Sequence, residues 1–376
     1  MVAIAVVALC TLALALLGDV FHWAPGVALT HLALSVGVLP LILAAMSFFV
    51  PTLTRSRAPT PAIRLLPWCA LIAALAPVGA FLGAPGAHRL IQLGAGLAAI
   101  VVVLFIGWIT QRMRRAVGAA HPCIYWYLAA LACLLIALLA ALASSFWPEH
   151  YLALRRVHLH LNVLGFVALT AVGTLQVLMP TIVQQPDPKA AHRLHRDIGW
   201  ALTGSVLVAL GAAWWKPLGI IGVAAWLYVL TRLAGAWWLN FRRKIVSRHG
   251  AAPSLMAALV GLGLLLITGA LHGEQILLAA RAVPAMFVLF LLPLVTGALS
   301  HLLPLWHRPQ ASSAAHDAQR ADLQLLGGLR AVLFVFGGAL LLGSIDLGYG
   351  IAAVALAAFA LQAIVALWRT DGATTR

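Results

Sequence analysis

Charged side chains are scarce in this sequence. Aspartate, glutamate, lysine and arginine make up 9% of its 376 residues, whereas 63% are hydrophobic; soluble proteins carry about 25% charged residues. No polar segment is long enough to fold as a separate soluble domain. Apolar stretches of the roughly 20 residues that cross a bilayer follow one another instead. These proportions exclude a soluble globular protein and indicate a polytopic, all-α membrane protein.

Acidic residues are the scarcest charged class: 9, against 24 lysines and arginines, which gives a formal net charge of +15. In a soluble protein this excess would suggest a nucleic-acid partner. Here the basic residues lie in short loops between apolar stretches, where membrane topology explains them better. The predicted partner is therefore the lipid bilayer, and nucleic-acid binding is excluded.

Several motifs that mark other protein classes are missing. The four cysteines form no CxxC pair, and the sequence has no Walker loop, GxGxxG, GxSxG or HExxH motif. A zinc site, a disulfide framework, ATP-driven work and hydrolysis therefore have no support, and no catalytic residue is predicted. Few acids lie within the apolar stretches, which argues against a proton-coupled carrier, because such carriers use charged relays.

The hydropathy pattern predicts about twelve transmembrane helices. The second, sixth and tenth end at Pro51, Pro180 and Pro304, where the proline ring interrupts the helical hydrogen-bond ladder. The predicted helices cover residues 2–17, 27–50, 65–82, 88–110, 124–146, 154–179, 198–215, 218–241, 255–271, 282–303, 325–343 and 347–368.

Basic residues divide unevenly between the two sets of loops. The loops after odd-numbered helices hold Arg89, Arg155, Arg156, Lys216 and Arg281. The positive-inside rule therefore places the even-numbered loops and both termini in the cytoplasm, and we expect a multi-pass protein of a bacterial inner membrane. The even-numbered loops and the tail hold Arg55, Arg57, Arg64, Arg112, Arg114, Arg115, Lys189, Arg193, Arg196, Arg242, Arg243, Lys244, Arg248, Arg308, Arg320, Arg369 and Arg376.

A long-range repeat relates the second, sixth and tenth helices. The segments His31–Leu53 and His160–Ile182 each begin with histidine at the outer end and reach a Pro-Thr pair at the inner end. The segment Pro284–Trp306 keeps the terminal proline but begins with Pro284. The spacing predicts one transmembrane domain, residues 1–376, built from three pseudo-repeats of four helices: 1–115, 116–243 and 244–376. Sites in such folds lie where the repeats meet.

Histidine is the residue type that carries most functional information. There are 14, and ionisable groups at membrane depth usually mark a pathway or a cofactor. His31 and His160 occupy equivalent repeat positions, so the sequence predicts that they meet as two axial ligands of one haem iron. Arg155 and Arg156 then suit the haem propionates. The alternative is that each imidazole only binds a nearby carbonyl at the membrane interface.

Two further histidines are candidate metal ligands. His158 lies two residues before His160, and successive helical residues turn by about 100°, so these imidazoles point to roughly opposite faces. His158 is therefore predicted to face a second haem or a copper site, or simply to form the polar end of its helix. His272, beside Glu274, suits copper, which imidazole binds well. The histidines at the inner end are expected to be solvated: His192, His195, His249, His307 and His316.

These features resemble the haem–copper oxidase subunit I superfamily and, more closely, its divergent NnrS-type haem- and copper-containing relatives. The segment HLALSVGVLPLILAAMSFFVPTLTR from His31 and the segment HLHLNVLGFVALTAVGTLQVLMPTI from His158 carry the likeness. The resemblance implies a twelve-helix fold, a haem ligand at His31 and a copper ligand at His158 or His160.

The chain departs from the oxidases at two helices that supply further histidine ligands there. His192 and His195 precede the seventh helix instead of lying within it, and the tenth helix has only His301, at its inner end. The resemblance therefore does not extend to an oxygen-reducing centre.

The leading hypothesis is a protein that binds haem b, with copper as a second candidate cofactor, for electron transfer or for handling nitric oxide or copper. Its redox partner would be a cytochrome or a quinone. The alternative is a transporter, metal-free or for metal ions, that uses the outer histidines as gates. A third class is an assembly or partner subunit of another membrane complex. The sequence does not decide whether a substrate is turned over.

Overall fold

The computed structural model describes residues 1–276 and 281–368, and all regular secondary structure in these ranges is helical. Ten helices are long and apolar enough to cross a membrane. A bent pair, Ser313–Leu323 with Gly327–Leu342, makes an eleventh if it is counted as one span. The expectation of an all-α, multi-pass membrane protein is therefore confirmed.

Contacts between residues divide the chain into two compact units. Unit 2 comprises residues 3–177 and 188–229, and unit 1 comprises residues 1–2, 178–187 and 230–376. Helices α8 and α10 each contribute one part to either unit.

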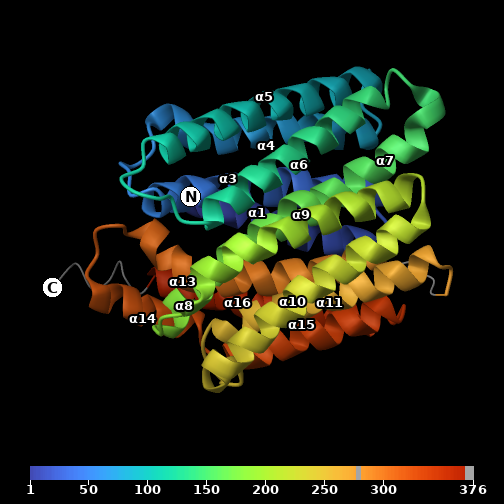
Figure 1. Cartoon of the computed structure of the whole chain (residues 1–376). Coiled ribbons are helices and arrows are strands. Elements are labelled where there is room, and N and C mark those ends of the chain that lie inside the picture. The colour runs from blue at the N-terminus through green and yellow to red at the C-terminus, as the bar shows by residue number, and fades with distance from the viewer. Residues whose placement is uncertain (277–280, 369–376) are drawn as a thin grey trace. The chain divides into compact units, whose positions relative to one another are not determined.

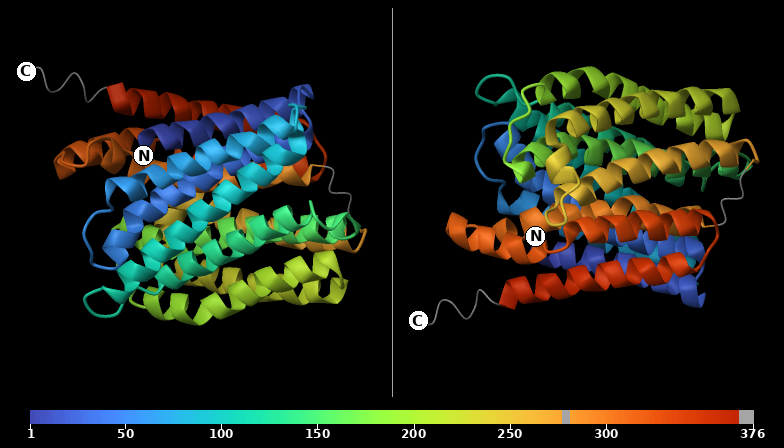
Figure 2. Two further views of the ribbon diagram at one scale, coloured as in Figure 1. Left: turned by 90° about the horizontal axis from the view of Figure 1, so that it is seen from above. Right: turned by 90° about the horizontal axis from the view of Figure 1, so that it is seen from below.

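Unit 2 contains the first helices of the chain. In Figures 1 and 2, α4 and α5 run side by side, and α6 packs against α5. The turn between α4 and α5 uses Gly83 and Gly86 at positive φ, which L side chains rarely adopt. The elements are α1 (Val2–Phe21), α2 (Gly26–His31), η1 (Leu32–Val38), α3 (Leu39–Leu53), α4 (Pro61–Phe81), α5 (Ala87–Arg114), α6 (Cys123–Ala143), η2 (Pro148–His150), α7 (Tyr151–His160), η3 (Leu161–Ala168), α8 (Leu169–Val183), α9 (Ala190–Ala213) and α10 (Lys216–Ile245).

Unit 1 contains the C-terminal helices. Helix α15 packs against both α11 and α16, and the short α14 packs on α13 and α16. Ser312 caps α14 by accepting a hydrogen bond from the backbone N–H of Ala315, at 3.3 Å. The elements are α11 (Ala252–Gly273), α12 (Ala282–Met286), η4 (Phe287–Leu291), α13 (Leu292–His307), α14 (Ser313–Leu323), α15 (Gly327–Leu342) and α16 (Leu347–Trp368).

Three long apolar helices each contain a π-helical segment. η1 begins directly after His31, η3 directly after His160, and η4 three residues after Pro284. Each extra residue in a π turn changes which side chains face a given neighbour, and such turns are frequent at functional sites. These are the three helices that the sequence repeat relates.

The structure departs from the loops predicted after the sixth and tenth helices. The segment before residue 325 contains the helix α14, where a loop is expected. His316 on this helix is 7% exposed and its Nε2 bonds the Arg308 carbonyl, so the expectation that it is solvated is wrong. Helix α9 begins at Ala190, and two buried charged residues in its first turns, Arg193 and Asp197, are not in a loop.

Candidate functional site

The structure brings His31 and His158 together within unit 2. Their ring centroids are 6.3 Å apart and their planes differ by 10°. His31 is the last residue of α2, and His158 lies in the last turn of α7. Both lie inside apolar helices that can span a membrane, Gly26–Leu53 and Pro148–Val183. Two imidazoles distant in sequence therefore share one site within the membrane-spanning part.

Backbone carbonyls fix the protonation of both rings. His31 Nδ1 lies 2.8 Å from the Val27 carbonyl oxygen, and His158 Nδ1 lies 2.8 Å from that of Ala137 on α6. A carbonyl only accepts, so each Nδ1 must carry the proton and donate. In the neutral imidazole, Nε2 is then the acceptor; that of His158 lies 3.5 Å from the Asn162 amide nitrogen. Histidines that bind a metal through one nitrogen typically hold the other in this way.

Two side chains adjoin the pair. The Phe81 ring at the end of α4 lies 4.7 Å from that of His31, tilted by 45°, and gives the site an apolar wall. The Asn162 amide donates to the His158 carbonyl at 2.7 Å and lies 3.3 Å from His158 Nδ1. Asn162 therefore holds the backbone that carries His158.

His160 is the structural counterpart of His31 but faces away from it. Its Nδ1 lies 2.8 Å from the carbonyl four residues earlier, that of Arg156, as His31 bonds Val27. Since His158 is in ring contact with His31, the turn of about 200° over two residues directs His160 to the opposite side of α7. The structure therefore pairs His31 with His158, where the sequence pairs it with His160.

Three other predicted site residues, Arg155, Arg156 and His272, are exposed. Arg156 donates to the Ala212 carbonyl at the end of α9, at 3.1 Å, and Arg155 is exposed. His272 is exposed at the end of α11 in unit 1. In the two ranges that the structure describes, no three histidine, cysteine, aspartate or glutamate side chains are grouped to hold a metal.

The geometry of His31 and His158 fits one metal atom between them. A metal–nitrogen bond is about 2.0 Å, and the nitrogen lies about 1.1 Å from the ring centre, so two opposed imidazoles have centroids about 6.2 Å apart. The observed separation is 6.3 Å. Offset aromatic stacks also span 4.5–7 Å, so distance alone does not identify a ligand pair. The carbonyl-bonded Nδ1 atoms add that the unprotonated nitrogen of each ring is Nε2, the atom that a metal would take.

The number of ligands narrows the choice of metal. A structural zinc ion takes four protein ligands, and calcium and magnesium take oxygen ligands. Haem iron receives four nitrogens from the porphyrin and needs only two axial ligands, for which histidine is common. Copper is also suited by imidazole. The residues present therefore fit a haem with two axial histidines, or copper.

Searches of protein-family models and of curated proteins found no match to this chain. The likeness to the haem–copper oxidases and their NnrS-type relatives therefore stays a prediction.

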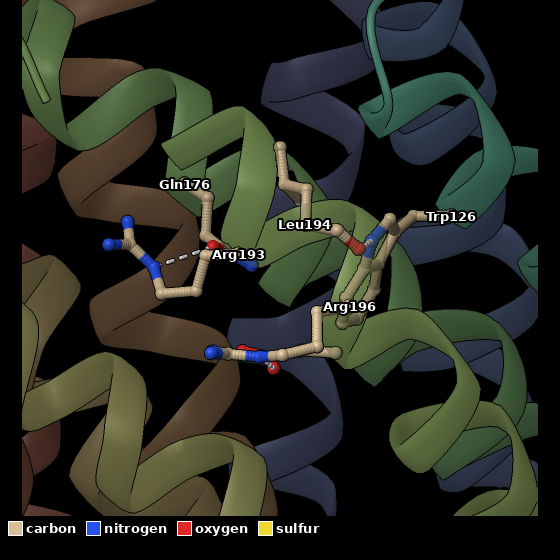
Figure 3. A network of polar contacts seen from close by, with 6 residues as sticks. Trp126, Gln176, Arg193, Leu194 and Arg196 are labelled. Carbon is tan, nitrogen blue, oxygen red and sulfur yellow. Dashed lines mark hydrogen bonds and ion pairs between the residues drawn. The ribbon is translucent and has the colours of Figure 1, made fainter. Parts of the chain in front are cut away.

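The structure also shows buried charged residues that the sequence places in loops. Figure 3 shows Arg193, whose Nε donates to Gln176 Oε1 at 3.0 Å, and Arg196, whose Nε donates to Asp197 Oδ1 at 2.8 Å. Arg193 is 5% exposed and Asp197 is fully buried. The regular spacing of Arg193 and Asp197 on one helical face is the signal that could have indicated burial.

A similar buried arginine lies in unit 1. Arg330 on α15 is 4% exposed; it donates to Gln362 Oε1 at 2.7 Å and to Ser300 Oγ at 3.1 Å. Its guanidinium lies over the Phe359 ring, 4.8 Å from the centroid. The sequence pattern predicts no role for Arg330, because a single arginine in an apolar helix has no periodic signature.

Proposed function

We propose that this protein binds a b-type haem in the membrane, with His31 and His158 as its axial ligands, and that it transfers electrons. The observation that supports this is the placement of two near-parallel imidazoles, 6.3 Å apart, whose Nδ1 atoms are held by backbone carbonyls. When bound, the haem would supply a one-electron redox couple.

The two histidines favour electron transfer over binding of a small gas. An iron held by an imidazole on each side would have no open coordination position for nitric oxide or oxygen. His31 and His158 would hold it, and the Phe81 ring packs on His31 with centroids 4.7 Å apart. Arg155, which is exposed near the same helix end, is the proposed partner of a haem propionate. The redox partner would be a quinone or a cytochrome.

The membrane placement is part of this proposal. We place the protein in a bacterial inner membrane with both termini and the even-numbered loops in the cytoplasm, because basic residues concentrate there. Helix α9 and the bent pair α14–α15, added to the ten helices that meet the length and apolarity limits, would give twelve spans. His31 and His158 would then lie towards the outer surface.

Two structural features support the three pseudo-repeats of four helices. The first is the π-helical segment near the start of each related helix. The second is an arginine at the fourth position of the next span: Arg193 in α9 and Arg330 in α15. Each bonds the residue four positions before the terminal proline, Gln176 and Ser300 respectively. The first repeat has Arg64 and Ser47 at these positions, although Arg64 is exposed.

The test is the absorption spectrum of the detergent-purified protein and three single variants. We expect a Soret band with b-type reduced bands in the wild type. His31→Ala and His158→Ala should each abolish or shift it, because each removes one axial ligand. His160→Ala is the matched control: it removes an equivalent, carbonyl-bonded imidazole from the same helix and should leave the spectrum unchanged.

Other outcomes would contradict the proposal in distinct ways. A colourless protein with one copper per chain, lost on Cu(I) chelation and in His158→Ala, would assign the pair to copper. A colourless, metal-free protein would favour the transporter. A spectrum altered only by His160→Ala would move the haem to the other face of α7.

A further inference from the structure

A hollow lies at the inner end of α5, in a part of unit 2 that the histidine pair does not involve. It measures about 500 Å³ and is lined by Gly107, Thr110, Gln111, Arg114 and Arg115. Thr110 and Gln111 lie three and four residues after Gly107, and Arg114 lies four and three residues after them, so these four share one face of the last two turns of α5. None of the five is acidic, so the lining carries two positive charges.

The two arginines are available to a ligand. Within residues 1–276 and 281–368, neither guanidinium is engaged in a hydrogen bond or an ion pair. Their neighbour Arg112 differs: it donates to the Ala58 carbonyl at 3.4 Å and lies over the Trp108 ring, 6.0 Å from its centroid. The positive charge of the hollow is therefore not neutralised by the protein.

An exposed apolar stripe leads along the same helix face into the hollow. Ile100 is 58% exposed, and Val103 and Leu104 are each 52% exposed. A Cβ built on Gly107 would meet nothing within 4 Å, so the groove is open there. Leu93 and Leu97, 58% and 45% exposed, extend the stripe on the same face. From Leu93 to Leu104 it rises about 17 Å at 1.5 Å per residue, about half of the hydrocarbon thickness. Its length and polarity match acyl chains beside a headgroup.

We propose that this surface binds an anionic phospholipid. Its phosphate would lie between Arg114 and Arg115, and Thr110 and Gln111 would bond the polar headgroup. Its acyl chains would follow the stripe above Gly107. Arginine is suited to this role because its planar guanidinium can bond two phosphate oxygens at once. The occupant is a membrane lipid and not free phosphate, because the basic hollow continues into the lipid-facing stripe.

The test is native mass spectrometry of the full-length protein in detergent, titrated with phosphatidylglycerol, phosphatidylcholine or inorganic phosphate. We expect phosphatidylglycerol to be retained in preference to both. Arg114→Gln and Arg115→Gln should each weaken its binding about fivefold, the effect of losing one basic contact at an anionic lipid. Gly107→Leu should weaken it further by filling the groove.

Two controls separate a built site from general attraction to positive charge. Arg112→Gln removes the same charge two residues from Arg114, and Gly235→Leu adds the same side chain on α10, where a Cβ also meets nothing within 4 Å. Both should bind lipid as the wild type does. The proposal fails if Arg112→Gln weakens binding as much as Arg114→Gln, if phosphatidylcholine binds equally, or if inorganic phosphate alone displaces the lipid.

Discussion

The close crossing of α9 and α10 offers a sharp test of how unit 2 packs. A Cβ added to Gly211 would lie 2.1 Å from the Gly219 nitrogen and 2.5 Å from its Cα, both backbone atoms that cannot rotate away. The two helices would have to separate by more than 1 Å, and overpacking of this kind costs about 1–3 kcal/mol. We expect the upper part of that range for Gly211→Ala, because the obstacle is backbone.

The same substitution at the facing glycine, Gly219, is the matched control. A Cβ on Gly219 would lie 3.8 Å from the Gly211 Cα and 4.0 Å from its carbonyl carbon, which are ordinary contacts. Gly219→Ala should therefore change stability by no more than about 0.5 kcal/mol. Tryptophan-fluorescence melting of the two variants in one detergent measures the difference. If Gly219→Ala lowers the melting temperature as much as Gly211→Ala, the crossing described here is incorrect.

Two further predictions concern buried polar groups. Arg330→Met should lower the unfolding free energy by about 1–3 kcal/mol, because the Ser300 hydroxyl and the Gln362 amide oxygen lose their hydrogen-bond donor. Arg242→Met, at an exposed arginine, is the control in the same melting assay. Burial lowers the pKa of His121 below its ordinary 6.5, and its Nδ1 accepts the Cys123 N–H at 3.3 Å. Because the folded state lowers this pKa, the neutral imidazole contributes stability that is full above pH 6.5. That contribution is lost as the pH falls from 6.5 through the lower folded-state pKa. His121→Gln should flatten that part of the pH–stability curve, and an unchanged slope would contradict the assignment.

The fold was largely predictable because hydropathy acts locally. Apolar runs locate the helices to within a few residues, but α3, α8 and α13 continue two or three residues past Pro51, Pro180 and Pro304, so the prediction that they end at these prolines is wrong. Segments that mix charge with apolar residues were harder to predict. Helix α14 carries His316 and Arg320 and has a polar surface, so its hydropathy is that of a loop. Its helical state depends on packing against α13 and α16.

The site was predictable in part. Helical periodicity places His158 and His160 on opposite faces of α7, but which face meets His31 depends on how α2, α6 and α7 pack. The repeat in the sequence aligns His31 with His160, and each of these imidazoles bonds the carbonyl four residues earlier. Residues at equivalent positions in successive repeats need not face each other. The sequence alone does not show which face of α7 meets His31.

Electron paramagnetic resonance of the oxidised protein tests most directly the claim that His31 and His158 hold one haem iron. Two axial imidazoles whose planes differ by 10° should give a rhombic low-spin ferric signal, and His158→Ala should convert it to a high-spin signal. A strongly anisotropic low-spin signal, typical of perpendicular imidazoles, would contradict the geometry. A wild-type spectrum that His158→Ala leaves unchanged would contradict the ligand assignment itself.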